Sequence, residues 1–464
     1  MSGKTYYIDP SVSSGTNDGL SPSLPLKDYT SREYSGGDSI LFKRGTVLRG
    51  ALITCDGEAG APITYGAYGE GDKPTFLGSV SAGDPQDWIE ERPSIWRYAG
   101  TFSSEVCNLI FNGGEFCGNL RWQIEDLQQP GEWHFTGIGR HGIGESHEEK
   151  SKDAPSELES SLPENDVLYL CSPTNPGLEY SAIECALWGA WKLAGGQNNI
   201  VMENLSFQNA GVHGYQGVGA RNIVIRDCEF KFIGGAVWHR GQRIRFGNAV
   251  EFWDGASDIT VEGCLFNNIY DSGVTHQGGL TRNIPERLYF RNNLFIDCGM
   301  SAYECREPSR EVYFEFNTSI NAGGGFSMQG ETPPRQSEIY PQPMGHHVFI
   351  WRIEPNTQLG KVYIRHNVFS EAPYGGAIYS IIDSADERQF IFDHNCYWQT
   401  SGQLLIHINN RDYLPAQFSE HQATGQDGNS VVAEPQFRDI VSGDYRLRAD
   451  SPHANKGIQS VPLP

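Results

Sequence analysis

Three segments of the chain carry acidic side chains at equivalent positions. The segments are RIRFGNAVEFWDGAS (243–257), NIYDSGVTHQGG (268–279) and DCGMSAYECREPSR (297–310). Alignment of their small and apolar residues places Glu251, Thr275 and Glu304 in one outward-facing column. If the three segments are neighbouring strands of a sheet, Glu251 and Glu304 lie roughly 9–10 Å apart at the backbone.

Two carboxyl groups at such a separation suit the hydrolysis of a glycosidic bond. That reaction uses a pair about 5–5.5 Å apart when configuration is retained and about 6.5–9.5 Å apart when it is inverted. We expect Glu304 and Glu251 to be the acid/base pair, with Asp271 as a third candidate, and His276 or His347 to orient groups or relay protons. A solvated strand face is the alternative interpretation of the column.

A second group of residues is basic. His239, Arg240, Arg243 and Arg245 lie in WHRGQRIRFGN, and Lys231 precedes them. β-Elimination in a uronic-acid polymer needs a cation to neutralise the carboxylate and a base to abstract the C5 proton. The candidates for that reaction are Lys231, Arg245, His276, Tyr303 and Arg306. Arginines that pair weakly with surface acids would explain the basic group equally well.

The segment PMGHHVFIWRIEP (343–355), which we expect to lie in a long loop, combines two adjacent histidines with an aromatic residue and an arginine. Adjacent histidines alone do not indicate a metal, so we predict no metal site. Trp351, Trp253 and Trp238 are suited either to stacking on sugar rings or to apolar packing. The predicted substrate-binding residues are Lys231, His239, Arg245, Trp253, Gln277, Arg306, His347, Trp351 and Arg352.

The elements that must position these residues repeat along the chain. Seven segments share an alternating apolar strand, then a small or amide residue, then an apolar or aromatic one. They are NIVMENLSF (199–207), NIVIRDCEF (222–230), DITVEGCLF (258–266), RLYFRNNLF (287–295), EVYFEFNTS (311–319), KVYIRHNVF (361–369) and QFIFDHNCY (389–397).

Two columns of this repeat suggest how the coils join. The seventh reads Leu205, Cys228, Cys264, Asn293, Asn317, Asn367 and Asn395. We expect its asparagines to adopt the left-handed conformation and to bond the backbone of the next coil. We expect the aromatic residues that end the pattern to stack inside the fold; these are Phe207, Phe230, Phe266, Phe295, Phe369 and Tyr397.

The intervals between repeats suit a solenoid. Phe207 and Phe230 are 23 residues apart, and Ser319 and Phe369 are 50 apart, so we expect 320–360 to leave the coil as a binding-site loop. Propeller blades repeat near 40–50 residues and fit the shorter intervals poorly. The pattern predicts an all-β fold, a single right-handed parallel β-helix with a β-rich insertion and long loops on one face, with a propeller or sandwich as the alternative.

The chain divides into three predicted parts. Residues 1–93 form an N-terminal cap and the first coils, and residues 94–190 form a β-rich insertion. Within the insertion, the charged segment 144–166 is expected to be an exposed, mobile loop. Residues 191–464 form the main coils and a C-terminal cap.

Composition narrows the possible partners. A net charge of −22 argues against nucleic acid, which needs a basic face. The ten cysteines include no CxxC pair, so most are expected to be buried thiols. No apolar run is long enough to span a membrane, and no signal-peptide pattern begins the chain. As written it is expected in the cytoplasm, or in the periplasm or outside the cell if a leader has been removed.

The two ends of the chain resemble a known superfamily. YYIDPSVSSGTNDGLSPSLPLKDY, GDSILFKRGTVLRG and APITYGAYGEGDKP are similar to the first coils of bacterial right-handed β-helix proteins that act on carbohydrate, and YRLRADSPHANKG is similar to their last coil. The resemblance, to the pectin lyase-like superfamily, covers most of the chain outside 94–190. It implies pectinases, alginate lyases and glycoside hydrolases as relatives, and it assigns no catalytic residue.

The leading hypothesis is a glycoside hydrolase that cleaves a poly- or oligosaccharide with paired carboxylates. A polysaccharide lyase acting on alginate-like or pectin-like uronic-acid polymers is the alternative enzyme. A non-catalytic carbohydrate-binding solenoid is the alternative without chemistry. None of these requires a cofactor, although calcium held between coils by Asp and Glu oxygens is left open, as is the oligomeric state.

Overall fold

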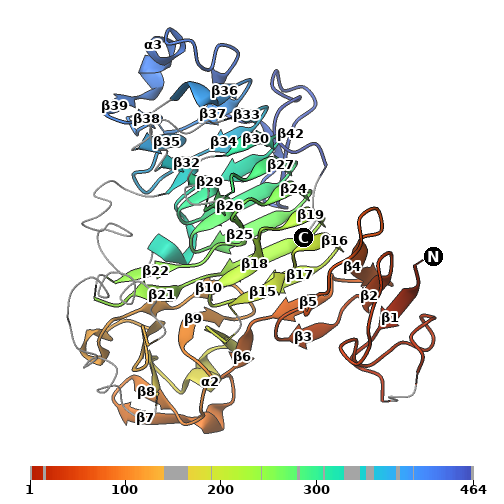
Figure 1. The fold of residues 1–464 in the computed structure, drawn as a ribbon. Helices are drawn as coiled ribbons and strands as arrows, with labels where there is room; N and C mark the ends of the chain where they lie inside the picture. The colour runs from red at the N-terminus through yellow and green to blue at the C-terminus, as the bar shows by residue number, and fades with distance from the viewer. Residues whose placement is uncertain are drawn as a thin grey trace, which may run out of the picture.

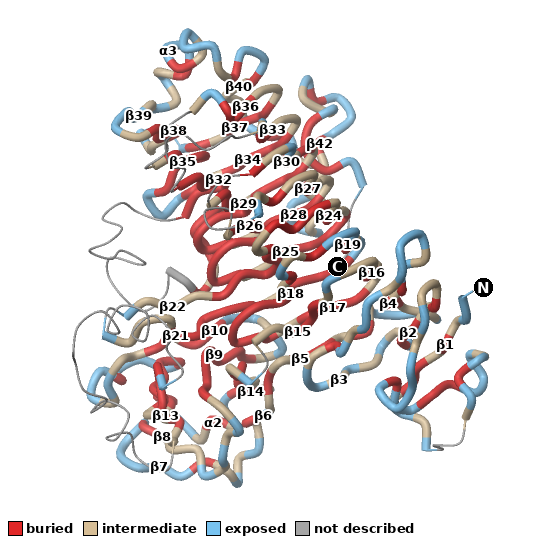
Figure 2. Tube along the Cα trace, viewed as in Figure 1, coloured by how far each residue is buried: buried red, intermediate tan, exposed pale blue. Residues whose placement is uncertain are grey.

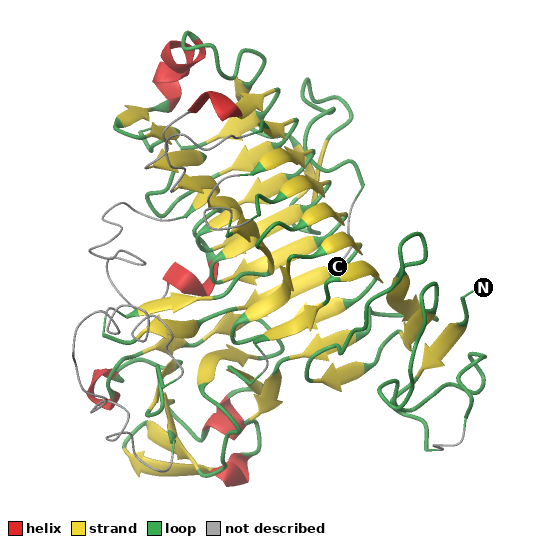
Figure 3. Ribbon diagram, in the orientation of Figure 1, coloured by secondary structure: helices red, strands yellow, loops and turns green. Residues whose placement is uncertain are grey.

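The computed structural model describes residues 3–13, 17–140, 166–189, 191–241, 243–278, 283–306, 309–328, 345–351, 360–382, 387–400 and 402–460. Most strands in these ranges belong to three long sheets, which the chain visits in turn (Figures 1 and 3). In each coil the chain crosses sheet 1, then sheet 2, then sheet 3, and it returns to sheet 1 one strand further along.

The three sheets are defined here by their strands among the described residues. Sheet 1 has the order β1 (Thr5–Ile8), β2 (Ser39–Lys43), β4 (Ile63–Tyr68), β16 (Asn198–Glu203), β19 (Arg221–Arg226), β24 (Ser257–Glu262), β27 (Glu286–Arg291), β30 (Arg310–Glu315), β33 (Val362–Arg365) and β36 (Phe390–Asp393). Sheet 2 has the order β3 (Val47–Arg49), β5 (Thr75–Leu77), β17 (Ser206–Gln208), β20 (Glu229–Ile233), β25 (Leu265–Ile269), β28 (Leu294–Cys298), β31 (Thr318–Ile320), β34 (Val368–Ser370), β37 (Cys396–Trp398) and β40 (Val431–Val432). Sheet 3 has the order β15 (Lys192–Gly195), β18 (His213–Val218), β23 (Val250–Trp253), β26 (Ser272–Gln277), β29 (Ser301–Arg306), β32 (His346–Trp351), β35 (Tyr379–Ile382), β38 (Ile406–Ile408) and β39 (Arg411–Tyr413).

Neighbouring strands in these sheets come from successive coils and pair in parallel, for example β24 with β27 and β26 with β29. The last strand of sheet 3, β39, is antiparallel to β38. Parallel pairing between successive coils closes a tube whose interior is a continuous core. The predicted right-handed parallel β-helix is therefore confirmed.

The interior of the tube is apolar along its whole length. One cluster of buried residues runs from Tyr6 to Phe418, and Figure 2 shows the buried strands as the red centre of the molecule. The predicted aromatic column is confirmed, because ring centroids are 5.3 Å apart for Phe207–Phe230 and 4.7 Å apart for Phe266–Phe295. Stacked rings of this kind fill the same place in each successive coil.

The predicted asparagine ladder is also confirmed, at the corner between sheet 1 and sheet 2. Asn317 Oδ1 accepts the backbone N–H of Asn293 at 2.9 Å, and its own N–H donates to Asn367 Oδ1 at 2.9 Å. The expectation of left-handed asparagines in this column was wrong. The residue one position earlier takes that conformation, as at Asn292 and Phe316 with φ of 53° and 56°.

A separate lobe lies beside the N-terminal half of the tube, at the lower left of Figure 1. Its elements are β6 (Ser79–Ser81), β7 (Trp88–Arg92), β8 (Ile95–Tyr98), β9 (Val106–Phe111), β10 (Phe116–Cys117), β11 (Asn119–Leu120), β12 (Glu132–Phe135), β13 (Leu168–Cys171), β14 (Ile183–Leu187) and the short helix α2 (Pro176–Glu179). The lobe begins at β6, before the expected boundary at residue 94, because β6 pairs with β14 rather than with a coil of the tube. Of the expected mobile loop 144–166, all but Asp166 lies outside the described residues.

The remaining described elements decorate the coils and the end of the tube. They are the hairpin strands β21 (Ala236–His239) and β22 (Ile244–Phe246), the strands β41 (Phe437–Asp439) and β42 (Asp444–Leu447), the helix α3 (Phe418–Gln422) and the 3₁₀ turns η1 (Pro85–Asp87), η2 (Ile124–Asp126), η5 (Gly325–Met328), η6 (Glu387–Gln389) and η7 (Pro415–Gln417). In the described part of the chain, no helix is long and apolar enough to cross a membrane.

The long segment 320–360 is not all loop. Residues His346–Trp351 form β32, a buried strand of sheet 3 between β29 and β35. Its side chains therefore belong to the sheet that carries Glu251 and Glu304. The cysteines are free thiols, and all except the exposed Cys55 are buried, as expected.

Candidate active site

Sheet 3 brings the two predicted carboxylates into one row. Glu251 on β23 pairs in register with Thr275 on β26, which pairs with Glu304 on β29. Their neighbours Val250 and Val274 fill the tube interior, so strand alternation turns the row outward. We call Glu251, Thr275 and Glu304 the carboxylate row.

Polar side chains surround the carboxylate of Glu251, which is 1% exposed. Trp253 Nε1 donates to Oε1 at 2.9 Å, and Asn248 Nδ2 donates to Oε2 at 2.8 Å. Gln216 Nε2, from the preceding strand β18, also donates to Oε1. A carboxylate accepts several such bonds at once, and these donors fix its orientation.

His213 completes this environment. Its Nε2 lies 3.4 Å from Glu251 Oε1, and its Nδ1 accepts the backbone N–H of Asn248 at 3.1 Å. The second contact requires an unprotonated Nδ1, so the ring proton of the neutral histidine is on Nε2, facing Glu251. Burial lowers the pKa of His213, which favours this neutral form.

A lysine lies on β15, the strand that precedes the His213 strand in sheet 3. Lys192 is the first residue of β15 and pairs in register with His213. Burial lowers the pKa of the Lys192 ammonium, and the nearby Glu251 charge acts in the opposite direction. Lys192 Nζ donates to the backbone carbonyl of Gln216 at 3.3 Å, so it is the cation at this end of the row.

Glu304 is as deeply buried as Glu251, and donors from both neighbouring strands reach its carboxylate. Its side chain is 1% exposed, Trp351 Nε1 donates to Oε1 at 2.7 Å, and Ser272 Oγ donates to Oε2 at 3.3 Å. Burial raises the pKa of the Glu304 carboxyl, the Arg306 charge and the Trp351 hydrogen bond lower it, and the Glu251 charge raises it further. The net direction is upward, which favours the protonated acid.

Arg306 and Gln277 flank the row on its C-terminal side. Arg306 Nη1 donates to Gln277 Oε1 at 3.0 Å, and its guanidinium lies 4.4 Å from the centre of the Trp351 ring. Trp253 pairs in register with Gln277. Four predicted substrate-binding residues, Trp253, Gln277, Arg306 and Trp351, are thus brought together.

Aromatic rings gather on the side of the site near Glu251. Phe246 on β22 lies 5.7 Å from both Trp188 and Trp191, and 5.4 Å from Trp238 on β21, measured between ring centroids. Trp191 also lies 5.3 Å from His213. These four rings, which we call the aromatic cluster, are partly exposed, and they join the end of the lobe to the hairpin β21–β22.

Three predicted residues lie inside the tube instead. His276 adjoins Thr275 in the strand, so alternation turns it inward; its Nε2 lies 2.9 Å from Tyr303 Oη, and burial lowers its pKa to about 3. Tyr303 belongs to the same interior core. His347 is fully buried, with Nδ1 2.7 Å from Ser319 Oγ. The predicted roles of these residues in the site are wrong, because none faces outward from sheet 3.

Three more predicted residues are engaged elsewhere. Asp271 Oδ2 accepts the backbone N–H of Gly247 at 2.7 Å, at the start of β26 and roughly 13 Å along the strand from Thr275. Lys231 lies on sheet 2 and pairs with Glu229 at 2.9 Å. Arg245 donates to the carbonyl oxygens of Gly235 and Cys107, which ties the hairpin to the lobe. The basic group is therefore not one catalytic cluster.

The last two predicted substrate-binding residues are His239 and Arg352. His239 is a partly exposed residue at the end of β21, beside the aromatic cluster. Arg352 lies outside the described residues.

The site includes residues that the sequence reasoning missed, chiefly Lys192, His213, Gln216, Asn248, Trp188 and Trp191. Extending the three-segment alignment by one coil would have found Gln216, since HGYQGV matches NAVEFW. The two tryptophans in LWGAWK lie at the end of the insertion, where no repeat predicts their neighbours.

No cluster of three or more His, Cys, Asp or Glu side chains suited to a metal ion occurs within the described ranges. The calcium ion left open by the sequence therefore remains an expectation without a candidate site.

Comparison with known proteins identifies the fold. No protein-family model matches the sequence, and a search of curated proteins finds no match. A solved glycoside hydrolase matches 97% of this chain and 99% of its own length, with a TM-score of 0.51 and 10% identity. The lacto-N-biosidase from Eubacterium ramulus matches 93% of this chain and 67% of its own length, with a TM-score of 0.47 and 12% identity. A pectate lyase matches 97% of this chain and 91% of its own, with a TM-score of 0.42 and 12% identity. At 10–12% identity this similarity is one of fold alone.

Proposed function

We propose that this protein is a glycoside hydrolase in which Glu304 is the general acid and Glu251 is the second carboxylate. The observation that carries the proposal is the carboxylate row, two buried glutamates on strands separated by one strand of an outward face. Their surroundings differ in the manner expected of an acid and its partner. Burial raises the pKa of Glu304, whereas three side-chain N–H donors converge on Glu251.

The spacing of the two strands suggests the stereochemistry. Glu251 and Glu304 stand on β23 and β29, with only β26 between them. Alternate strands of a sheet are roughly 9–10 Å apart at the backbone. This spacing leaves room for a water molecule and favours inversion, for which about 6.5–9.5 Å is typical.

The aromatic cluster supports a sugar as the substrate. A pyranose presents C–H groups on its faces and hydroxyl groups at its rim, which match an aromatic ring and nearby polar side chains respectively. Trp191 and His213 bring such a ring and a polar group together next to Glu251. Gln277 and Arg306 supply hydrogen-bond donors on the other side of the row.

One observation favours a polysaccharide lyase as the second candidate. Lys192 stands near Glu251 with a lowered pKa, and Arg306 stands near Glu304. In that reaction Lys192 would take the C5 proton of a uronic-acid residue and Arg306 would neutralise its carboxylate. The overall charge of −22 is less favourable to an anionic polymer than to a neutral one.

A screen of neutral and uronic-acid polysaccharides separates the two reactions. Hydrolysis yields new reducing ends without the ultraviolet absorbance of an unsaturated sugar, and we expect this result. Reducing ends that appear together with that absorbance would replace the hydrolase by the lyase. The Lys192→Met variant then decides whether Lys192 is its base.

A further inference from the structure

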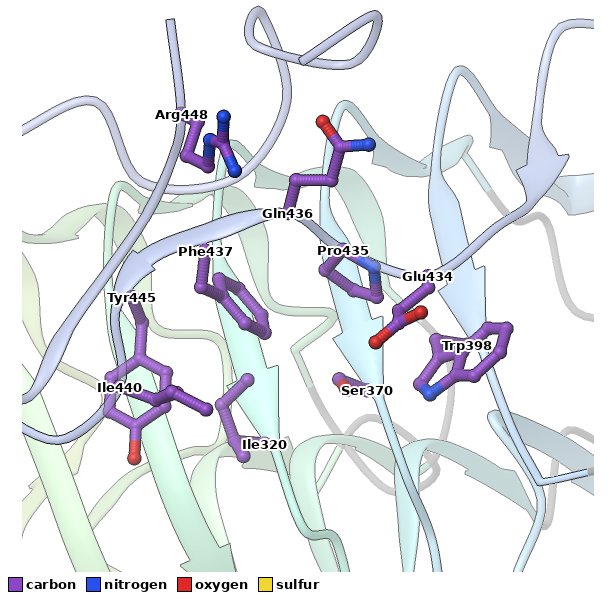
Figure 4. Close-up of a pocket in the computed structure, with 10 residues that line it drawn as sticks. All are labelled: Ile320, Ser370, Trp398, Glu434, Pro435, Gln436, Phe437, Ile440, Tyr445 and Arg448. Carbon is purple, nitrogen blue, oxygen red and sulfur yellow. The ribbon is translucent and has the colours of Figure 1, made fainter. Parts of the chain in front are cut away.

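A concave feature lies on sheet 2, away from the carboxylate row. A groove of about 500 Å³ separates the outer face of this sheet from the chain around β41 and β42 (Figure 4). It is lined by Ile320, Ser370, Trp398, Glu434, Pro435, Gln436, Phe437, Ile440, Tyr445 and Arg448. The volume is within the range of about 300–1,000 Å³ that small-molecule sites occupy.

The floor of the groove is built by register. Ile320, Ser370 and Trp398 pair in sequence on β31, β34 and β37 and point outward as one column. The opposite wall comes from the C-terminal segment, where the Phe437 and Tyr445 rings pack edge to face at 5.6 Å. The groove is thus made by two elements of the fold, and Trp398 is partly exposed in it.

Three polar groups in the groove are left without a partner by the described part of the chain. The side chains of Trp398, Glu434 and Gln436 make no hydrogen bond or ion pair with any other described residue. Figure 4 shows the Glu434 carboxylate beside the Trp398 ring, whereas the Gln436 amide points away from the floor of the groove. An apolar ligand would bury these groups without replacing their water, which is unfavourable.

The charge of the groove selects among polar ligands. Arg448 is paired with Asp450 at 2.8 Å, so its cation is already compensated. Glu434 has no such cation partner among the described residues, and its charge disfavours an anionic ligand. A carboxylate accepts two hydroxyl donors, an amide both donates and accepts, and an indole packs against C–H groups.

We propose that this groove is a second, non-catalytic site that binds neutral sugar units. A sugar ring packs on Trp398, and its hydroxyl groups bond Glu434. The site is independent of the proposed hydrolase activity, because it lies on sheet 2 and shares no residue with the carboxylate row.

Calorimetric binding to the full-length Glu251→Gln, Glu304→Gln double variant tests this proposal without consuming the ligand. The probes are xylotetraose, cellotetraose, mannotetraose and a uronic-acid tetramer. We expect at least one neutral tetramer to bind. Adding Trp398→Ala or Glu434→Gln should weaken that binding at least tenfold, and Trp191→Ala at the aromatic cluster should leave it in place.

Glu434→Gln is isosteric and exposed, so its effect cannot be attributed to misfolding. The proposal is overturned if no neutral tetramer binds, or if both groove variants bind as tightly as the parent. It is also overturned if the uronic-acid tetramer alone depends on Trp398. None of these results bears on the proposed function, which is tested separately by the activity of the wild-type protein.

Discussion

Trp351 Nε1 donates a hydrogen bond of 2.7 Å to Glu304 Oε1, from the neighbouring strand of sheet 3. A hydrogen bond to the carboxylate stabilises its charged form, so this contact opposes the rise in pKa that burial causes. Because the proposed acid must be protonated, the Trp351 hydrogen bond lowers the pH at which activity is lost on the alkaline side.

We therefore expect Trp351→Phe to raise the pKa of Glu304 and to move the alkaline limb of the kcat/KM profile to higher pH. The phenyl ring keeps the packing but not the donor. Arg306→Met should move the limb in the same direction, since the Arg306 charge also lowers this pKa. Profiles measured from about pH 4 to pH 9 check the shift.

Trp253→Phe, which removes a donor to Glu251, is the matched control and should leave this limb in place. A limb that stays fixed or moves to lower pH in Trp351→Phe would show that Glu304 is not the acid.

The aromatic cluster should act on binding more than on the chemical step. Trp191 packs against His213, which in turn faces Glu251. Trp191→Ala is expected to raise KM about tenfold with a smaller change in kcat, whereas Trp191→Phe should restore most of the affinity. Steady-state kinetics on the substrate found by the screen measure this split. Equal losses in kcat and kcat/KM at constant KM would instead place Trp191 in the transition state.

The buried His276 should make stability depend on pH. Its pKa is about 3 in the folded protein and near 6.5 in the unfolded chain. Between these values only the unfolded chain binds the proton, so stability falls as pH decreases from 6.5 towards 3. The loss at pH 5 relative to pH 8 is on the order of 2 kcal/mol.

Thermal unfolding of the wild type and His276→Phe at pH 8, 6 and 5 checks this prediction. The variant loses the contact with Tyr303, so its absolute stability is not the readout. The readout is the slope of stability against pH, and we expect this slope to be shallower in the variant. Identical slopes would mean that His276 titrates normally in the folded protein.

The sequence predicts the carboxylate row because a solenoid makes long-range neighbours out of repeated positions. Once GNAVEFW and DSGVTHQ are aligned, Glu251 and Thr275 are adjacent wherever the coils stack. The same logic predicts the asparagine ladder from Asn293 to Asn395, whose members bond one another through successive coils. His276 was misassigned although its position beside Thr275 implies the opposite face.

Other features have no repeat to predict them. Lys192 and Trp191 reach the site only because the chain returns from the lobe to the tube at that point. The lobe is closed by β6 pairing with β14, a contact between residues far apart in sequence that no local pattern indicates. Similarly, His346–Trp351 is an uninterrupted buried strand in which alternation is hidden, so its place in sheet 3 depends on tertiary packing.

The catalytic role of the carboxylate row is tested most directly by measuring the activity of Glu304→Gln and Glu251→Gln on the substrate identified by the screen. Glu262→Gln, on the outer face of sheet 1, is the control. Removal of a positioned acid or base costs about 10²–10⁴-fold in rate. We expect a loss of that size in kcat/KM for both row variants, with folding and the control unaffected. Full activity in either row variant would contradict it and would place the chemistry elsewhere in the molecule.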